Sequence, residues 1–134
     1  MRQPVGTITT IEALSLRLSG MRGTEEYELQ GKGEQTELFH YRMIYRDGEE
    51  QREELFRTLC DTVSLLEMLN AVKMGSWNGF DGPHPRNVSD GIMFELKASV
   101  NGGTEIHARG SENFPAHFRE FTDWLHAAER ESLE

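Results

Sequence analysis

The chain has 134 residues, which suits one domain, and it carries a formal net charge of −9 at pH 7 with an isoelectric point near 5.0. Because this charge repels phosphate groups and the Lys and Arg residues are dispersed, we expect no binding to nucleic acid or membranes. The first residues lack the apolar core of a signal peptide and no run approaches the ~20 apolar residues of a membrane span, which predicts a cytoplasmic location.

Three strands are predicted in the N-terminal part of the chain. Residues 13–19 alternate apolar and polar side chains, as a strand with one buried face does. Residues 20–23 form a turn, and residues 26–30 continue the alternation until the glycines at 31–33 interrupt it. Residues 38–45 have apolar side chains on both faces, so we expect this third strand to be central.

A long helix is predicted next. The pair Asp47-Gly48 is a hairpin signal, but the apolar residues beyond it recur every three or four positions. We therefore interpret Asp47 as an N-cap with Glu50 in a capping box, a helix over residues 49–74, and a left-handed C-cap at Gly75. The apolar stripe consists of Leu55, Leu59, Val63, Leu66 and Leu69, widened by Phe56, Cys60 and Val72.

The clearest pattern lies at residues 92–110, where two alternating runs flank Asn101-Gly102-Gly103. A two-residue loop would place apolar side chains opposite polar ones, whereas a three-residue loop keeps each face uniform. The sequence therefore predicts a three-residue hairpin loop. The expected pairs are Ala98 with Ile106, Leu96 with Ala108, Glu95 with Arg109, and Lys97 with His107.

The last predicted helix begins near Pro115, a residue tolerated in a first helical turn. Its apolar face carries Phe118, Phe121, Trp124, Leu125 and Ala128. The elements together predict a single α+β domain over residues 1–134, in the order of three strands, helix, two strands and helix. We expect one antiparallel sheet of about five strands with both helices on one face.

No common catalytic motif is present: the sequence lacks a phosphate-binding loop, a nucleophile elbow, a zinc-protease motif and paired cysteines. Enzymatic activity is accordingly less expected than binding, although enzymes without such motifs exist. Cys60, the sole cysteine, lies on the predicted apolar stripe and is interpreted as a core residue. The five histidines are scattered over different elements, so we predict no metal and no other cofactor.

The stretch 75–91, GSWNGFDGPHPRNVSDG, is a long irregular connection, and long loops often carry function. One interpretation is a binding site for a ligand or partner. Its candidate residues are Trp77, Asp81, His84, Arg86 and Asp90. The other interpretation is structural: Trp77 and Phe80 pack over the end of the sheet, because large apolar side chains need burial in either case.

Residues 77–125 resemble a pattern in a family of uncharacterised bacterial proteins of unknown function. The resemblance is carried by W-N-G-F, by S-D-G-I-M-F-E-L, and by G-S-E-N-F-P-A-H-F-R-E-F with W-L beyond it. In that pattern a tryptophan precedes an Asp-Gly strand start, and a Gly-Ser-x-x-x-Pro step opens the last helix. Phe94 stands where the pattern more often has tryptophan. The resemblance implies no catalytic residue.

Three functions are therefore considered. The leading hypothesis is a small binding or regulatory protein that recognises another protein, of basic character, without catalysis. The alternative is a small-molecule site or hydrolase beneath the 75–91 loop, with Asp81, His84, Arg86 and Asp90 as its polar groups. The third is a homo-oligomeric structural subunit that pairs through the exposed edge of its first or last strand.

Overall fold

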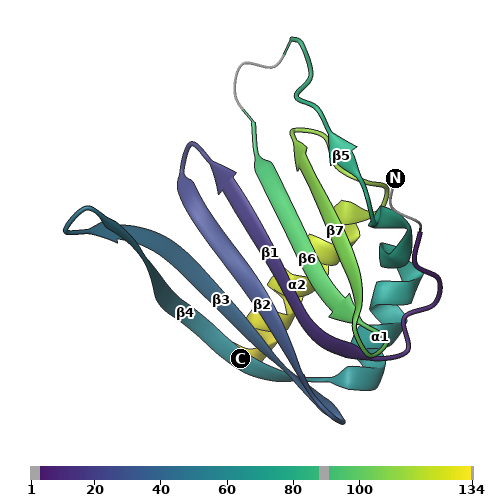
Figure 1. The fold of residues 1–134 in the computed structure, drawn as a ribbon. Coiled ribbons are helices and arrows are strands. Elements are labelled where there is room, and N and C mark those ends of the chain that lie inside the picture. Colours follow the sequence, from purple (N-terminus) through teal and green to yellow (C-terminus); the bar gives the residue numbers. More distant parts are fainter. Residues whose placement is uncertain (1–3, 88–90, 134) are drawn as a thin grey trace.

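The computed structural model describes residues 4–87 and 91–133, and these form one sheet with two α-helices (Figure 1). The seven strands lie in the order β4-β3-β2-β1-β6-β7-β5. Their bounds are β1 Ile11–Gly20, β2 Gly23–Lys32, β3 Gln35–Arg46, β4 Glu49–Asp61, β5 Asp81–Gly82, β6 Met93–Val100 and β7 Thr104–Ser111. The helices are α1 Thr62–Ala71, the short 3-10 helix η1 Met74–Trp77, and α2 Phe118–Leu133.

The predicted α+β class agrees with this structure, whereas the details of the sheet differ. The sheet has seven strands instead of about five, and it is mixed because β5 runs parallel to β7. The first and last strands of the chain are not its edges. β1 lies between β2 and β6, β7 lies between β6 and β5, and the long edge strand is β4.

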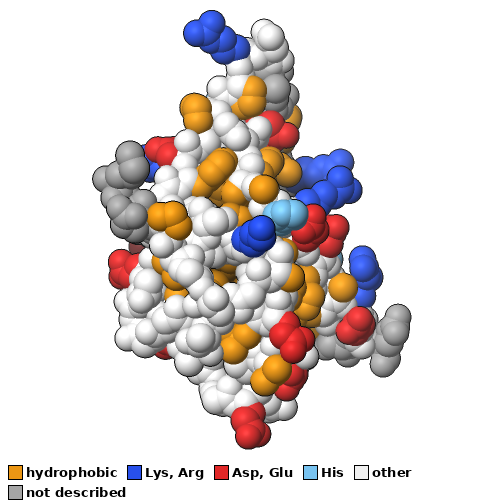
Figure 2. Space-filling model, turned by 90° about the vertical axis from the view of Figure 1, so that its right-hand side faces the viewer, with side chains coloured by type: hydrophobic (Ala, Val, Ile, Leu, Met, Phe, Trp, Pro, Cys, Tyr) orange, Lys and Arg blue, Asp and Glu red, His pale blue; other side chains and the backbone are white. Residues whose placement is uncertain are grey.

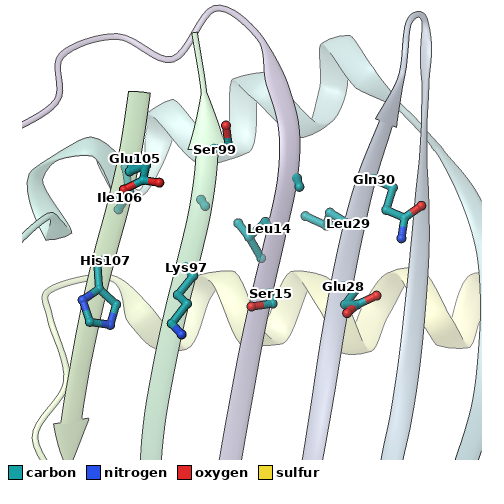
Figure 3. Close-up of a pocket in the computed structure, with 12 residues that line it drawn as sticks. Leu14, Ser15, Glu28, Leu29, Gln30, Lys97, Ser99, Glu105, Ile106 and His107 are labelled. Carbon is teal, nitrogen blue, oxygen red and sulfur yellow. The ribbon is translucent and has the colours of Figure 1, made fainter. Parts of the chain in front are cut away.

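The core lies between one face of the sheet and the two helices. Cross-strand pairing aligns apolar residues in rows, such as Leu16 opposite both Tyr27 and Leu96. Leu65 of α1 and Leu125 of α2 are fully buried against this face. Figures 1 and 3 show both helices behind the strands, so the opposite face of the sheet, which we call the open face, is left without helices.

The predicted helix at residues 49–74 is wrong over its first half. Asp47 and Gly48 have φ angles of 53° and 79°, the left-handed pair of a two-residue hairpin turn. The chain therefore returns as β4, which pairs along β3. The N-cap is Asp61 instead of Asp47: its carboxylate accepts a hydrogen bond from the Ser64 N–H at 2.9 Å.

Gly75 is not the left-handed C-cap that the sequence predicts. It lies within η1, and the left-handed residue is Lys73, with a φ of 58°. Glycine is required at 75 for a different reason. A Cβ at this position would lie 2.2 Å from the carbonyl oxygen of Val5. The N–H of Val5 in turn donates a hydrogen bond to the carbonyl of Gly75. The N-terminal segment thus packs directly on the backbone at this point.

The hairpin of β6 and β7 confirms the predicted three-residue loop and all four predicted pairs. Its loop residues have φ angles of 53°, 79° and 124°, a conformation for which Asn and Gly are suited. The last helix starts at Phe118, three residues beyond the predicted Pro115, and it buries the predicted apolar face. Among the described residues, no helix is long and apolar enough to cross a membrane.

Candidate functional site

Trp77, the first candidate in the 75–91 loop, belongs to the core. Its side chain is only 2% exposed, and its indole N–H donates to the carbonyl of Ala116 at 3.0 Å. Its ring centroid lies 5.8 Å from that of Phe118 and 6.1 Å from that of Phe121. Trp77 therefore joins the chain before β5 to the first turn of α2, as the structural interpretation of the loop describes.

Phe80 anchors the next part of the loop. Its ring is partly buried and lies 6.2 Å from the ring of Phe94. Its backbone carbonyl accepts a hydrogen bond from the Arg109 N–H, and Gly79 N–H donates to the carbonyl of His107. These bonds attach the segment to the edge of β7, where it becomes β5. A short parallel strand of this kind has no alternating pattern in the sequence.

The polar candidates of the loop have separate partners. Asp81 is exposed and pairs with Arg109 at 3.5 Å, whereas His84 Nδ1 lies 2.8 Å from the Ser111 hydroxyl. Arg86 is exposed, and Asp90 lies outside the described residues. Within residues 4–87 and 91–133, no three His, Cys, Asp or Glu side chains are placed to hold a metal ion.

The open face of the sheet carries a depression of about 500 Å³ that sequence reasoning missed (Figure 3). Its floor is formed by small side chains on the central strands: Ala13 and Ser15 on β1 and Ser99 on β6. Ala13 lies opposite Ser99, so the small residues are neighbours across the two strands. Longer side chains on the strands around them leave this floor recessed. The rim consists of Glu28 and Gln30 on β2, Lys97 on β6, and Glu105 and His107 on β7.

Two rim groups are held in place by hydrogen bonds to neighbouring charged side chains. The Glu28 carboxylate accepts a hydrogen bond from Arg52 at 2.7 Å. His107 Nε2 lies 3.2 Å from the Glu95 carboxylate, and this hydrogen bond lowers the pKa of Glu95. Glu105 is exposed and makes no ion pair among the described residues. Carboxylates thus stand on the β2 side and on the β7 side of the depression.

Toward β4, the open face is closed by stacked side chains. Phe39 and Tyr41 stack with their centroids 5.9 Å apart. The guanidinium of Arg57 lies 4.8 Å above the Phe39 ring, and that of Arg52 lies 4.2 Å above the Tyr41 ring. Since these cations cover the aromatic rings, the accessible hollow of the open face is confined to β2, β1, β6 and β7.

A second hollow, of about 490 Å³, lies between the end of β4 and α2. It is lined by Thr58, Leu59, Cys60, Asp61, Ser64, Trp124, Ala127, Ala128 and Glu131. Cys60 is half-buried here on a strand and not on the predicted helix, but it does pack against the core as expected. Burial raises the pKa of its thiol, so the protonated form, which is unreactive, is favoured over the thiolate.

A buried histidine links the sheet to α2. His40 stacks on Tyr27, and its two ring nitrogens lie 3.2 Å from a Glu25 oxygen and 3.1 Å from a Glu129 oxygen. Burial opposes protonation, but the two carboxylates outweigh it and raise the pKa of His40. The same contact lowers the pKa of Glu25. We call this group the His40 cluster, and its place inside the fold makes it a structural element.

The side of the molecule that carries β5 and α1 presents a mixed surface. Figure 2 shows its hydrophobic side chains in small separated groups, with charged side chains of both signs scattered between them. We therefore take the open-face depression as the candidate site.

In comparisons with known proteins, no family model, no curated protein and no solved structure matched this chain. The resemblance of residues 77–125 to an uncharacterised bacterial family stays a prediction.

Proposed function

We propose that this protein is a binding domain, and not an enzyme, that holds an extended segment of a basic partner protein in the open-face depression. The observation that carries the proposal is the depression itself, about 500 Å³ in volume, on the sheet face that the helices leave uncovered. Its volume falls within the range of known ligand sites, roughly 300 to 1,000 Å³. Since it is shallow and crosses four strands, it suits a length of chain better than an enclosed small molecule.

Charge favours a basic partner. Glu105 stands exposed on the β7 side of the depression, while Glu28 on the β2 side is paired with Arg52 and Lys97 lies between the two carboxylates. The net charge of −9 gives the whole surface an acidic field that attracts cations over a distance set by the ionic strength. We expect Lys or Arg side chains of the partner to reach the rim while small or apolar side chains occupy the floor.

The test is a peptide titration. Two synthetic peptides of equal length, one rich in Lys and one rich in Glu, are titrated into the protein at low and moderate salt. We expect the basic peptide to bind, with an affinity that falls as salt rises. Ser15→Arg fills the floor and adds a positive charge, so it should weaken binding about tenfold or more, which corresponds to about 1.4 kcal/mol.

The matched control is Gln51→Arg, which adds the same charge at an exposed position of β4 outside the depression. This variant should bind within a factor of about two of the wild type, since a distant surface charge acts only through the screened field. Equal binding by Ser15→Arg and the wild type, or a preference for the acidic peptide, would contradict the proposal.

A further inference from the structure

The free edge of β4 carries unusual apolar exposure. β4 is a 13-residue strand at the end of the sheet, with β3 on one side and solvent on the other (Figure 1). Leu55 and Leu59 on this strand are 47% and 54% exposed, and Val63, just beyond it, is 62% exposed. An edge with unpaired backbone groups and exposed apolar side chains is a template for another strand.

The alternation of hydrogen bonds between β3 and β4 shows which backbone groups of β4 point to the free edge. The Thr62 N–H donates to the Glu34 carbonyl at 3.0 Å, and the register continues with Cys60 opposite Thr36. In an antiparallel ladder, hydrogen-bonded pairs alternate with pairs that are not bonded. The backbone groups of Thr58 and Cys60 therefore point toward β3. Those of Arg57, Leu59 and Asp61 point to the free edge.

We propose that β4 pairs with β4 of a second copy of this chain, antiparallel, about a two-fold axis at Leu59. In this register Leu59 faces Leu59 of the other copy. Arg57 of each copy faces Asp61 of the other, so the interface contains two reciprocal ion pairs. The other two exposed apolar side chains, Leu55 in the strand and Val63 in the first turn of α1, flank the paired segment at its two ends.

Other two-fold registers lack this complementarity. An axis at Arg57 places two guanidinium groups face to face, and an axis at Asp61 places two carboxylates face to face, which is unfavourable in a sheet. An axis at Thr58 or at Cys60 sets Leu59 against a charged residue, Arg57 or Asp61. Charge and apolar pairing thus favour the Leu59 register.

The first part of β4 limits the pairing to a short segment. Leu55 is an extra residue, since His40 pairs with Phe56 and the next residue of β3 pairs with Glu54. Such a bulge, together with the charged run Glu49–Glu54, is a common protection of edge strands. The unprotected part is residues 57–61, which is the segment that the proposed register uses.

The second hollow adjoins this segment on the helix side of the sheet. Thr58 of one copy lies opposite Cys60 of the other, and Cys60 lines the hollow together with Trp124. A two-fold axis perpendicular to the sheet keeps both open faces on the same side, so a dimer would present two open-face depressions to one partner. The dimer is inferred from β4 alone and does not depend on what the depression binds.

The main experiment is sedimentation velocity on the full chain over a concentration series. The wild type is expected to dimerise, and Arg57→Asp should weaken the dimer at least tenfold because it places like charges together. Asp61→Arg should weaken it as much, although it also removes the N-cap of α1, so restoration of the dimer in the mixture below is what identifies the charge effect. An equal mixture of the two variants should restore the dimer, because one copy then carries a carboxylate at both positions and the other copy carries a guanidinium at both. Arg22→Asp, in the turn between β1 and β2, makes the same charge change away from the interface and should have no effect.

A wild type that stays monomeric, or a mixture that fails to restore the dimer, would overturn the proposal. Cross-linking gives a second test that does not depend on the folding of the charge variants. In a Cys60→Ser background, Leu59→Cys should form a disulfide across the axis under mild oxidation, because paired Cα atoms lie about 5.5 Å apart. Equally efficient cross-linking of Leu55→Cys in the same background would also overturn the register.

Discussion

Replacing Trp77 should destabilise the protein strongly, since the structure assigns it to the core. Its side chain is 2% exposed, and it contacts Phe118 and Phe121. Trp77→Ala removes this packing and leaves a cavity, which typically costs about 3 to 5 kcal/mol. Trp77→Phe keeps most of the apolar contact but leaves the Ala116 carbonyl without its 3.0 Å donor, so we expect about 1 to 2 kcal/mol.

The assay is urea unfolding followed by circular dichroism. Because domains are stable by only about 5 to 15 kcal/mol, the Ala variant should lose a large part of its free energy of unfolding, with little change in the m-value. Trp124→Ala is the matched control: Trp124 is only partly buried, so its loss should be smaller. A loss below about 1 kcal/mol for Trp77→Ala would refute the structural interpretation and return the 75–91 loop to consideration as a site.

Three other predictions concern stability and reactivity. The His40 cluster should stabilise the fold most between about pH 4.5 and 6.5. Because the pKa of His40 is raised in the folded protein, its stabilisation is lost as His40 deprotonates at higher pH, and because the pKa of Glu25 is lowered, its stabilisation is lost as Glu25 is protonated at lower pH. The melting temperature of His40→Gln, measured against pH, should lack this maximum. Gly75→Ala should cost about 1 to 3 kcal/mol by collision with a backbone oxygen, whereas Gly6→Ala, which meets nothing within 4 Å, should be tolerated, and equal urea midpoints would contradict this. Iodoacetamide should alkylate Cys60 slowly in the native protein and faster in urea; equal rates would show that its thiol is not held at a raised pKa.

The sequence predicts the hairpin of β6 and β7 well because its structure depends on residues that are close together in the chain. Apolar and polar residues alternate from Phe94 to Val100 in β6 and from Glu105 to Arg109 in β7, and the loop Asn101-Gly102-Gly103 accepts left-handed backbone. Only one loop length keeps both faces uniform, so the register follows from the pattern. The helix face of α2 was predictable for the same reason, since Phe121 and Leu125 are buried at helical spacing.

The error over β4 has a specific cause. Leu55, Leu59 and Val63 recur at steps of four, which is typical of a helix, yet these three residues are exposed. The partly buried positions in the second half of the strand are instead Phe56, Thr58 and Cys60, two residues apart, and the bulge at Leu55 interrupts this two-residue period. The pair Asp47-Gly48, in contrast, correctly indicated a hairpin turn between two strands.

The open-face depression could not be read from sequence because its floor is made of small residues on separate strands. Ala13 and Ser99 are 86 positions apart, and only the β1–β6 register makes them neighbours. Likewise, nothing local in the sequence shows that Trp77 is covered by α2, which follows it by about forty residues. Contacts between distant parts of the chain create the depression and bury Trp77, so neither feature has a local sequence motif.

The most direct test of the account is an NMR titration of the isotope-labelled protein with the Lys-rich peptide. If the depression is the binding surface, the largest shift changes should fall on its floor and rim, at the amides of Ser15, Glu28, Ser99 and Glu105 on β1, β2, β6 and β7. Shift changes concentrated on residues 75–87, or spread evenly over the acidic surface, would contradict it.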